Sequence, residues 1–149
     1  MQHIQNLING QLVPPVSGTY IDNYNPSNGK VYSLIPDSDE RDVEAAVEAA
    51  QKAFPAWSGM AKEKRSAILI KLSELIEKNL ERFAIAESMD NGKPLWLSRS
   101  VDIPRAVSNF HFYATAALHL HDESHSMGSL AINYTTRTPI GVAGCISPW

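Results

Sequence analysis

The stretch "GVAGCISPW", residues Gly141 to Trp149, indicates the fold class of this chain most directly. From Ile140 to Ile146 nearly every residue is apolar, and polar residues do not alternate with them. A strand of this kind is typical of a parallel sheet that helices cover on both faces. In open sheets of that class, ligands bind beyond the carboxyl ends of the strands. The pattern therefore predicts an α/β fold with a ligand-binding edge at residues 147–149.

Upstream of this stretch, apolar residues recur every three to four positions, which is helical spacing. The spacing predicts helices over residues 39–54, 62–89 and 95–119. Ser38 or Asp39 can cap the first helix, and Pro55 should end it. Asn79 predicts a break in the second helix, and Pro104 predicts a kink or a late start in the third. The residues predicted to face inward from the second and third helices are Ile68, Leu72, Leu75, Ile76, Leu80, Phe83, Ala84, Ile103, Val107, Phe110, Ala114 and Leu118.

Two other regions are predicted to form strands. Asn9-Gly10 favours a tight hairpin turn because both residues tolerate a positive φ. A second turn at Asn25–Gly29 precedes a predicted strand over Val31–Ile35. After the helices, apolar and polar residues alternate from Leu130 to Thr135, which predicts a half-exposed strand.

The composition of the 149 residues excludes several classes of function. The 13 basic and 16 acidic residues give a net charge of −3 without a basic stripe, which argues against nucleic-acid and anionic-membrane partners. A single cysteine excludes an internal disulfide and fits a reducing compartment. No segment has the length of a membrane span, and the polar opening MQHIQNLING lacks the apolar core of a signal peptide. We therefore predict a cytoplasmic protein with one domain.

Three motifs invite a catalytic interpretation that their surroundings do not favour. Cys145 could be a nucleophile, but its apolar neighbours disfavour a reactive thiolate and predict a core position. Asn91–Pro94 lacks the Ser or Thr that a phosphate loop needs after Lys93, so a helix end capped by Gly92 is preferred. A zinc site would need more ligands than the sequence supplies at His111, His119, His121 and His125.

Asp102-Ile103-Pro104-Arg105 is a sharper candidate for a binding motif. An arginine beside a helix-distorting proline can be directed at a cavity, where its planar guanidinium group suits a carboxylate. An ordinary surface arginine is the alternative that the residues alone leave open. Ser147-Pro148-Trp149 suits the wall of a pocket for a flat ring, and a routine strand-to-loop turn is the alternative there.

Several segments match one known family when they are taken together. They are Ile8–Gly10, Asn25–Gly29, Asp42–Ala50, Ala53-Phe54, Trp57, Arg65, Ile68-Leu69, Glu87–Pro94 and Pro139–Trp149. In combination they resemble the N-terminal part of the NAD-dependent aldehyde dehydrogenase superfamily, with Asn91 where Thr is usual. The resemblance implies that residues 1–149 form an incomplete Rossmann-like cofactor domain, with a β-hairpin, helices and the start of a parallel sheet. It further implies that 126–139 belong to an oligomerisation flap.

A narrower match points to one branch of this family. Tyr20–Asp22, Val101–Arg105, Asn109-Phe110 and Ala131–Tyr134 are similar to segments of the 2-aminomuconic and 2-hydroxymuconic 6-semialdehyde dehydrogenases. Because those substrates carry a carboxylate besides the aldehyde, the resemblance implies that Arg105 binds this group. His111 departs from the pattern, since relatives often carry Arg or Lys there.

The resemblance also implies a mechanism and a cofactor. In the family, a cysteine thiolate attacks the aldehyde, an oxyanion hole stabilises the thiohemiacetal, hydride passes to NAD and water releases the acid. Ile146, Ser147, Pro148 and Trp149 are implied to line the NAD site. The oxyanion-hole asparagine would follow Trp149, and the nucleophile and base would lie further along. We therefore expect the 149-residue segment to be inactive alone.

A cation site and a homo-oligomer are further implications of the resemblance. Asn23, Tyr24 and Asp102 match positions that hold a monovalent cation in some relatives. The strand Leu130–Arg137 would join subunits into a dimer or tetramer. Two alternatives stay open. One is a naturally short, non-catalytic module that binds a partner through this strand. The other is a fragment of a betaine-type or general aldehyde dehydrogenase.

Overall fold

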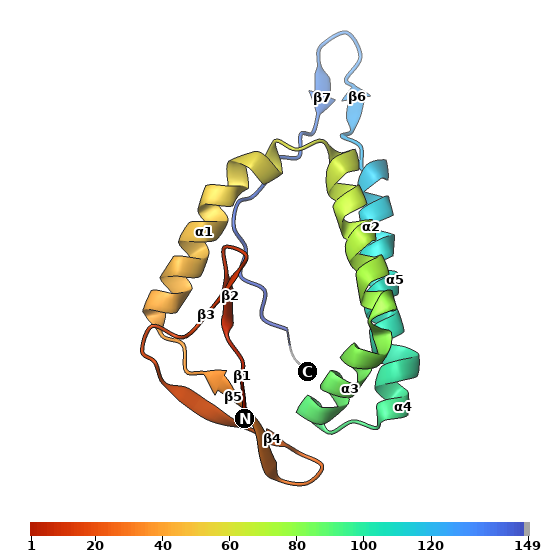
Figure 1. The fold of residues 1–149 in the computed structure, drawn as a ribbon. Helices are drawn as coiled ribbons and strands as arrows, with labels where there is room; N and C mark the ends of the chain where they lie inside the picture. Colours follow the sequence, from red (N-terminus) through yellow and green to blue (C-terminus); the bar gives the residue numbers. More distant parts are fainter. Residues whose placement is uncertain (148–149) are drawn as a thin grey trace.

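The computed structural model describes residues 1–147 and combines helices with small sheets, as the α/β prediction requires. The strands are β1 (Gln2–His3), β2 (Asn6–Ile8), β3 (Gln11–Val13), β4 (Tyr20–Asn25), β5 (Lys30–Pro36), β6 (Ser124–Ser126) and β7 (Ile132–Tyr134). The helices are α1 (Glu40–Ser58), α2 (Lys62–Lys78), α3 (Leu80–Asn91), α4 (Leu95–Leu97) and α5 (Ile103–Ala116). Figure 1 shows α1 on one side and the packed pair α2 and α5 on the other. The last described residues run between them.

The N-terminal strands follow the predicted turns. β2 and β3 pair antiparallel through Asn9 and Gly10, whose φ angles of 51° and 75° are those of a tight two-residue hairpin turn. β4 and β5 pair antiparallel on either side of the predicted turn at Asn25–Gly29. β1 joins β5 in parallel, which places the extreme N-terminus in the same three-stranded sheet.

Asp42 docks this N-terminal region onto the first turn of α1. Asp39 caps α1, and the Asp42 carboxylate accepts the Asp39 backbone N–H at 3.0 Å, which completes a capping box. The same carboxylate accepts the Val16 backbone N–H at 3.0 Å and the Asn6 amide at 3.3 Å. Asp42 is buried. One side chain therefore joins the helix start, the β2–β3 hairpin and the loop that follows the hairpin.

Two predicted helix boundaries are confirmed and one is wrong. Asn79 separates α2 from α3, and Gly92 ends α3 in the left-handed conformation with a φ of 76°. Pro55, however, does not end α1, which continues to Ser58. A proline removes only its own N–H, and the Pro55 carbonyl still accepts the Gly59 N–H at 3.1 Å. The helix therefore gains a last turn beyond the proline.

The predicted inward stripe of α2 is largely wrong. Ile68, Leu72 and Leu75 are exposed, whereas Ser66 and Ser73 are buried. Ser73 lines the groove that α2 forms with α5. Small side chains such as Ser73 allow close packing of the two helices, and of the longer apolar residues Leu69 faces α5 while Ile68, Leu72 and Leu75 stay exposed. Ala84, Ile103 and Ala114 are buried, as predicted.

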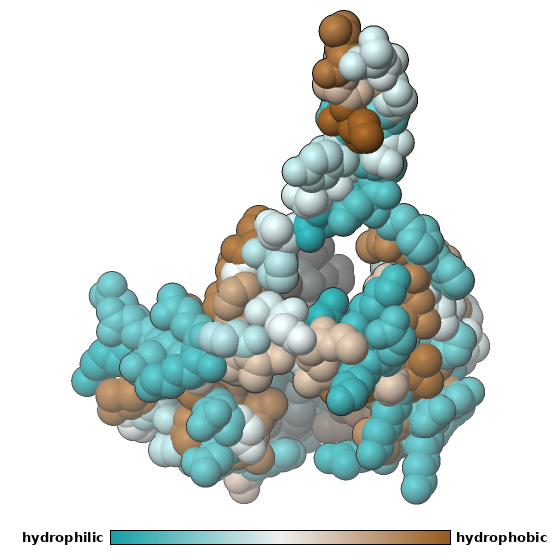
Figure 2. Space-filling view, turned by 90° about the horizontal axis from the view of Figure 1, so that it is seen from above, coloured by the Kyte–Doolittle hydropathy of each residue, from teal (hydrophilic) through white to brown (hydrophobic). Residues whose placement is uncertain are grey.

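β6 and β7 form an arm that projects from the rest of the chain (Figure 1). The prediction of a half-exposed strand is wrong, because both faces of the arm are exposed. Leu130 and Ile132 have exposed fractions of 90% and 72%, and Figure 2 shows hydrophobic residues gathered on the arm. The arm thus presents apolar side chains without a partner among residues 1–147.

The predicted strand at Ile140–Ile146 is also not formed. These residues are extended and exposed, with exposed fractions of 96% for Ile140 and 98% for Ile146. Gly141, Val142 and Gly144 line a shallow pocket with residues of α1. A strand exists only where its backbone groups pair with a neighbour, and residues 1–147 place no strand beside this segment. Helix α1 therefore borders the segment without completing a sheet.

Candidate functional site

Arg105 lies in the first turn of α5, where the chain emerges from an irregular helical turn. Ser98–Asp102 form a π-helical turn, and the Ile103 N–H donates to the Ser98 carbonyl, five residues back. Pro104 follows immediately and has no N–H to donate. Of the kink or late start predicted from Pro104, the late start is present, because α5 begins at Ile103, directly after the π-helical turn. Such turns often occur at functional sites in proteins.

The Arg105 guanidinium group is exposed and forms no ion pair within residues 1–147. Other arginines do pair: Arg41 with Asp39, Arg99 with Glu81, and Arg137 with Asp122. The pairing lowers the pKa of the Glu81 carboxyl below its ordinary value, chiefly because Arg99 donates hydrogen bonds to the ionised form. Arg105 is thus a cation that is available to a ligand.

Lys93 connects the end of α3 to the start of α5. Its Nζ lies 2.8 Å from Glu87 Oε1 and 2.8 Å from Asp102 Oδ2. Hydrogen bonds to Asp102 first, and to Glu87 second, raise the pKa of Lys93 above its ordinary value. The ammonium group therefore stays charged between the two carboxylates. Sequence reasoning considered Lys93 only for a phosphate loop, because its partners lie six residues before it and nine residues after it.

A second polar cluster ties the β4–β5 hairpin to α3. The Asn23 side-chain amide donates to Asp90 Oδ1 at 3.0 Å, to the Tyr32 hydroxyl at 3.0 Å and to Ser33 Oγ at 3.1 Å. The Tyr32 hydroxyl also donates to Asp90 Oδ1 at 2.7 Å. Burial raises the pKa of Tyr32, and the Asp90 carboxylate raises it further. The cluster keeps Tyr32 neutral and holds the hairpin against α3.

The three predicted cation ligands have separate partners. Asn23 belongs to the Asp90 cluster, the Tyr24 hydroxyl donates to Asp22 Oδ2 at 3.3 Å, and Asp102 pairs with Lys93. A metal cation on Asp102 would face the Lys93 ammonium group, which already neutralises this carboxylate. Residues 1–147 also contain no group of three His, Cys, Asp or Glu side chains arranged to hold a metal ion. The Asn23, Tyr24 and Asp102 set stays a prediction, and Asp102 does not fit it.

The predicted cofactor wall is only partly described. Ile146 and Ser147 are exposed, and Pro148 and Trp149 lie outside the described residues. Cys145 is exposed rather than buried, so the predicted core position is wrong for the described residues. The exposure follows from the missing strand pairing, because a segment with no neighbouring strand has no covered face.

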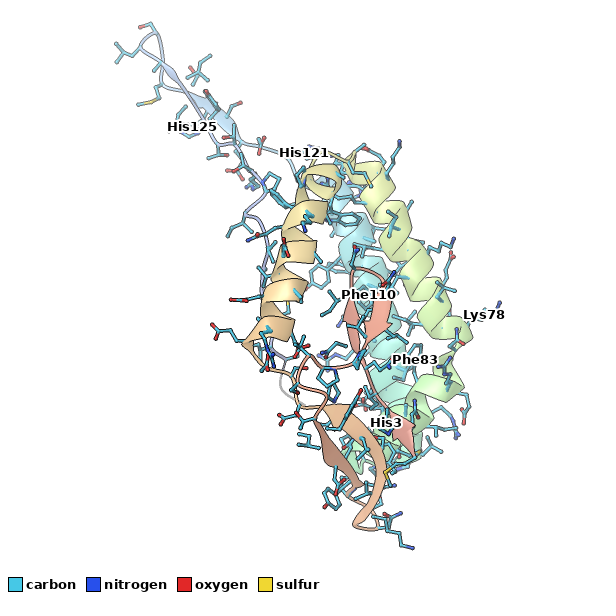
Figure 3. All side chains as sticks on the ribbon, turned by 60° about the vertical axis from the view of Figure 1, so that its left-hand side comes forward. His3, Lys78, Phe83, Phe110, His121 and His125 are labelled. Atoms are coloured by element: carbon cyan, nitrogen blue, oxygen red, sulfur yellow. The ribbon has the colours of Figure 1, made fainter. Side chains whose placement is uncertain are left out.

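An open groove of about 580 Å³ lies between α2 and α5, next to Pro104. Its lining includes Ser73, Glu74, Glu77, Leu80, Val107, Ser108, His111, Phe112 and Thr115. The two glutamates disfavour an anionic ligand there, and no group of three His, Cys, Asp or Glu side chains within residues 1–147 is arranged around His111 to hold a metal ion. Figure 3 places His121 at the base of the arm and His125 farther out along β6. None of the helices within residues 1–147 combines the length and the apolar character that crossing a bilayer requires.

Comparison with known proteins identifies the family. The model described as "Aldehyde dehydrogenase family" matches residues 12–149. The 2-aminomuconic semialdehyde dehydrogenase of Mus musculus is 48% identical over 147 residues, which is 98% of this chain and 30% of that protein. The chain therefore spans about 30% of the length of the curated relatives it matches.

Solved structures agree with the sequence comparison. A putative aldehyde dehydrogenase from Burkholderia cenocepacia matches with a TM-score of 0.87 and 36% identity over 94% of this chain and 29% of that one. An NAD⁺ complex of aldehyde dehydrogenase from Bacillus cereus matches with a TM-score of 0.84 and 32% identity, covering 89% of this chain and 28% of that one. The resemblance drawn from the sequence motifs is confirmed. The chain belongs to the aldehyde dehydrogenase family.

Proposed function

We propose that the complete protein is an NAD-dependent dehydrogenase that oxidises a carboxylate-bearing, muconic-type semialdehyde to the acid. The observation that carries this proposal is the unpaired Arg105 guanidinium group, exposed at the start of α5. A planar guanidinium binds a carboxylate through two parallel hydrogen bonds. The 48% identity to a 2-aminomuconic semialdehyde dehydrogenase supports the same substrate class.

In this proposal, the residues of this chain bind and orient the reactants. Arg105 holds the substrate carboxylate, which fixes the position of the aldehyde carbon relative to the enzyme. The apolar side chain of Ile146, with Ser147, Pro148 and Trp149, forms one wall of the NAD site. Ile146 fits this role because its side chain is exposed and can contact a flat ring. NAD supplies the hydride acceptor when it is bound. The thiolate nucleophile, as in the family mechanism, belongs to the complete protein, which we place in the cytoplasm.

The substrate assay tests the proposal directly. With NAD⁺, the complete protein should oxidise 2-hydroxymuconic 6-semialdehyde with a kcat/KM at least about tenfold above that for hexanal, because only the first substrate gains a charge-assisted hydrogen bond. NADH absorbance gives the rates. Betaine aldehyde and NADP⁺ serve as comparison substrate and cofactor. A preference for hexanal or betaine aldehyde would instead assign the protein to a general or betaine-type branch. The 149-residue segment alone should produce no NADH at any concentration.

We also propose that the β6–β7 arm joins two copies of the protein. Leu130, Ile132 and Tyr134 are all exposed on the arm. One edge of β7 pairs with β6, and its opposite edge has no strand partner within residues 1–147. Exposed apolar side chains and a free strand edge are features of a surface that pairs with another chain. Arg137 fixes the base of the arm by donating to the His121 carbonyl at 2.6 Å and pairing with Asp122 at 3.4 Å.

Replacing Ile132 with Asp should shift the complete protein toward smaller assemblies, because a buried unpaired carboxylate is costly at an interface. Light scattering coupled to gel filtration over a range of concentrations measures the mass. Asn133→Asp is the matched control, because it adds the same charge on the neighbouring residue, which points to the opposite face of β7. If Ile132→Asp leaves the mass distribution unchanged, the arm is not the subunit interface.

A further inference from the structure

We propose that Lys93 keeps Arg105 available to the substrate by holding the Asp102 carboxylate away from it. The inference rests on the proposed function, in which Arg105 binds a substrate carboxylate. Lys93 is then a positioning residue, because it acts through Asp102 and touches no reacting atom.

Asp102 and Arg105 are placed to pair with one another. Asp102 and Ile103 both have helical backbone angles, with φ and ψ of −67° and −51°, and −69° and −44°. Asp102 is therefore joined to α5 as a regular helical turn, and Arg105 follows three residues later. Side chains three apart on a helix lie on the same face, and an acidic residue that precedes a basic one at this spacing forms an ion pair. The pair is not formed, since the carboxylate is 2.8 Å from Lys93 Nζ.

Lys93 is well fixed for this task. Its backbone N–H donates to Asn91 Oδ1 at 3.0 Å, and its carbonyl accepts the Ser88 hydroxyl at 2.7 Å. Its Nζ is also held by Glu87, which in turn accepts the Asn91 amide at 2.7 Å. The side chain of Lys93 is only 25% exposed, against 48% for Arg99 in the neighbouring pair. The Lys93–Asp102 pair is therefore better shielded from water than the surface ion pair beside it.

The ion pairs of the π-helical turn determine which cation Asp102 would meet if Lys93 were lost. The Ser98 hydroxyl is buried and has no hydrogen-bond partner among the described residues. Two ion pairs hold the turn: Arg99 pairs with Glu81 of α3 near its start, and Asp102 pairs with Lys93, which follows α3, at its end. Only the second involves a residue within one helical turn of Arg105. Loss of Lys93 would release Asp102 at that position. Arg99 and Arg105 each lie three residues from Asp102, and Arg99 already pairs with Glu81, so Arg105 is the cation left for the carboxylate.

The test uses the complete enzyme and five variants, one of which is Arg105→Ala. Lys93→Met should raise the KM for 2-hydroxymuconic 6-semialdehyde about two- to fivefold, the range expected for a partly exposed ion pair, and leave the KM for hexanal unchanged. Lys93→Met combined with Asp102→Asn should restore the KM for the semialdehyde to the parent value, because the competing charge is gone. Asp102→Asn alone should leave it unchanged. Glu81→Gln is the matched control, since it breaks the other ion pair of the same turn.

Each outcome decides the matter. Restoration by the second substitution supports the inference, because a merely structural role for Lys93 would make the double variant worse than the single one. A double variant as impaired as Lys93→Met overturns it, as does an equal effect on hexanal or an equal effect of Glu81→Gln. If Arg105→Ala raises the KM for the semialdehyde alone and Lys93→Met does not, the positioning role of Lys93 is wrong while the role of Arg105 in binding the carboxylate stands. If Arg105→Ala changes the KM values for the semialdehyde and hexanal equally, Arg105 does not bind the substrate carboxylate, and the positioning role of Lys93 is wrong as well.

Discussion

Replacing Arg105 with Ala in the complete enzyme is expected to raise the KM for 2-hydroxymuconic 6-semialdehyde about 10- to 100-fold, since a hydrogen bond to a charged group contributes about 1.5–3 kcal/mol. The KM for hexanal should not change, because that substrate has no carboxylate. If Arg105 binds the substrate equally in the ground and transition states, kcat stays constant as well. Steady-state NADH formation with the two substrates measures both quantities.

Arg82→Ala is the control for this experiment. Arg82 is exposed on α3 and, like Arg105, forms no ion pair within residues 1–147, so its removal makes the same change in net charge. Arg105→Lys adds a finer test, because a lysine keeps the charge but loses the planar fork that binds both carboxylate oxygens. We expect the KM of the Arg105→Lys variant for the semialdehyde to lie between the values of the parent and of Arg105→Ala. Equal effects of Arg105→Ala on the KM for the semialdehyde and for hexanal would show that Arg105 does not bind the substrate carboxylate.

Asp42→Ala is expected to loosen the N-terminal region by about 2 kcal/mol. The substitution removes one half of the capping box and the Asp42 acceptor of two part-buried hydrogen bonds, from the Val16 N–H and from the Asn6 amide. A loss of this size makes local opening roughly 30-fold more frequent. Hydrogen–deuterium exchange of the complete protein should therefore accelerate by this factor in peptides that cover the β2–β3 hairpin and the start of α1.

The matched variant is Glu44→Ala, which removes an exposed acidic residue two positions along α1. It should change exchange in these peptides by less than about twofold, because exposed side chains without a partner contribute little. Peptides from α5 report whether the effect stays local. Uniformly faster exchange, there and at the hairpin, would show that Asp42 stabilises the whole fold rather than the docking of the hairpin.

The sequence predicted the local elements of this chain well. Asn9-Gly10, Asp39, Asn79 and Gly92 each act through the conformation or hydrogen bonding of a single residue, so a short window suffices to recognise them. The α2 stripe was wrong because burial depends on which face meets α5, and that choice is made by Ser66 and Ser73 rather than by the apolar residues. Local patterns show which residues are apolar, but the neighbours decide which are covered.

In the candidate site, too, the features that depend on neighbouring residues could be predicted, and those that depend on distant residues could not. Arg105 could be chosen as a candidate from the sequence, because the adjacent Pro104 indicates an irregular helix start at that position. Lys93 could not, because Glu87 and Asp102 meet it only after the chain folds through the end of α3 and α4. The apolar run at Ile140–Ile146 predicted a strand that residues 1–147 do not form, although the α/β class that it indicated is confirmed. Strand pairing, however, needs neighbours, and the relatives that contain this segment are more than three times as long as the chain.

For the direction in which Arg105 points, the number of residues in the π-helical turn Ser98–Asp102 matters more than their identity. Each residue of an α-helix advances the next by about 100° around the axis, so the loss of one residue from the turn would rotate all of α5 by that amount. Arg105 would then point a quarter-turn away, even though every side chain of α5 was retained. Among homologues, we therefore expect substitutions inside this turn to be common and single-residue deletions to coincide with a change of substrate.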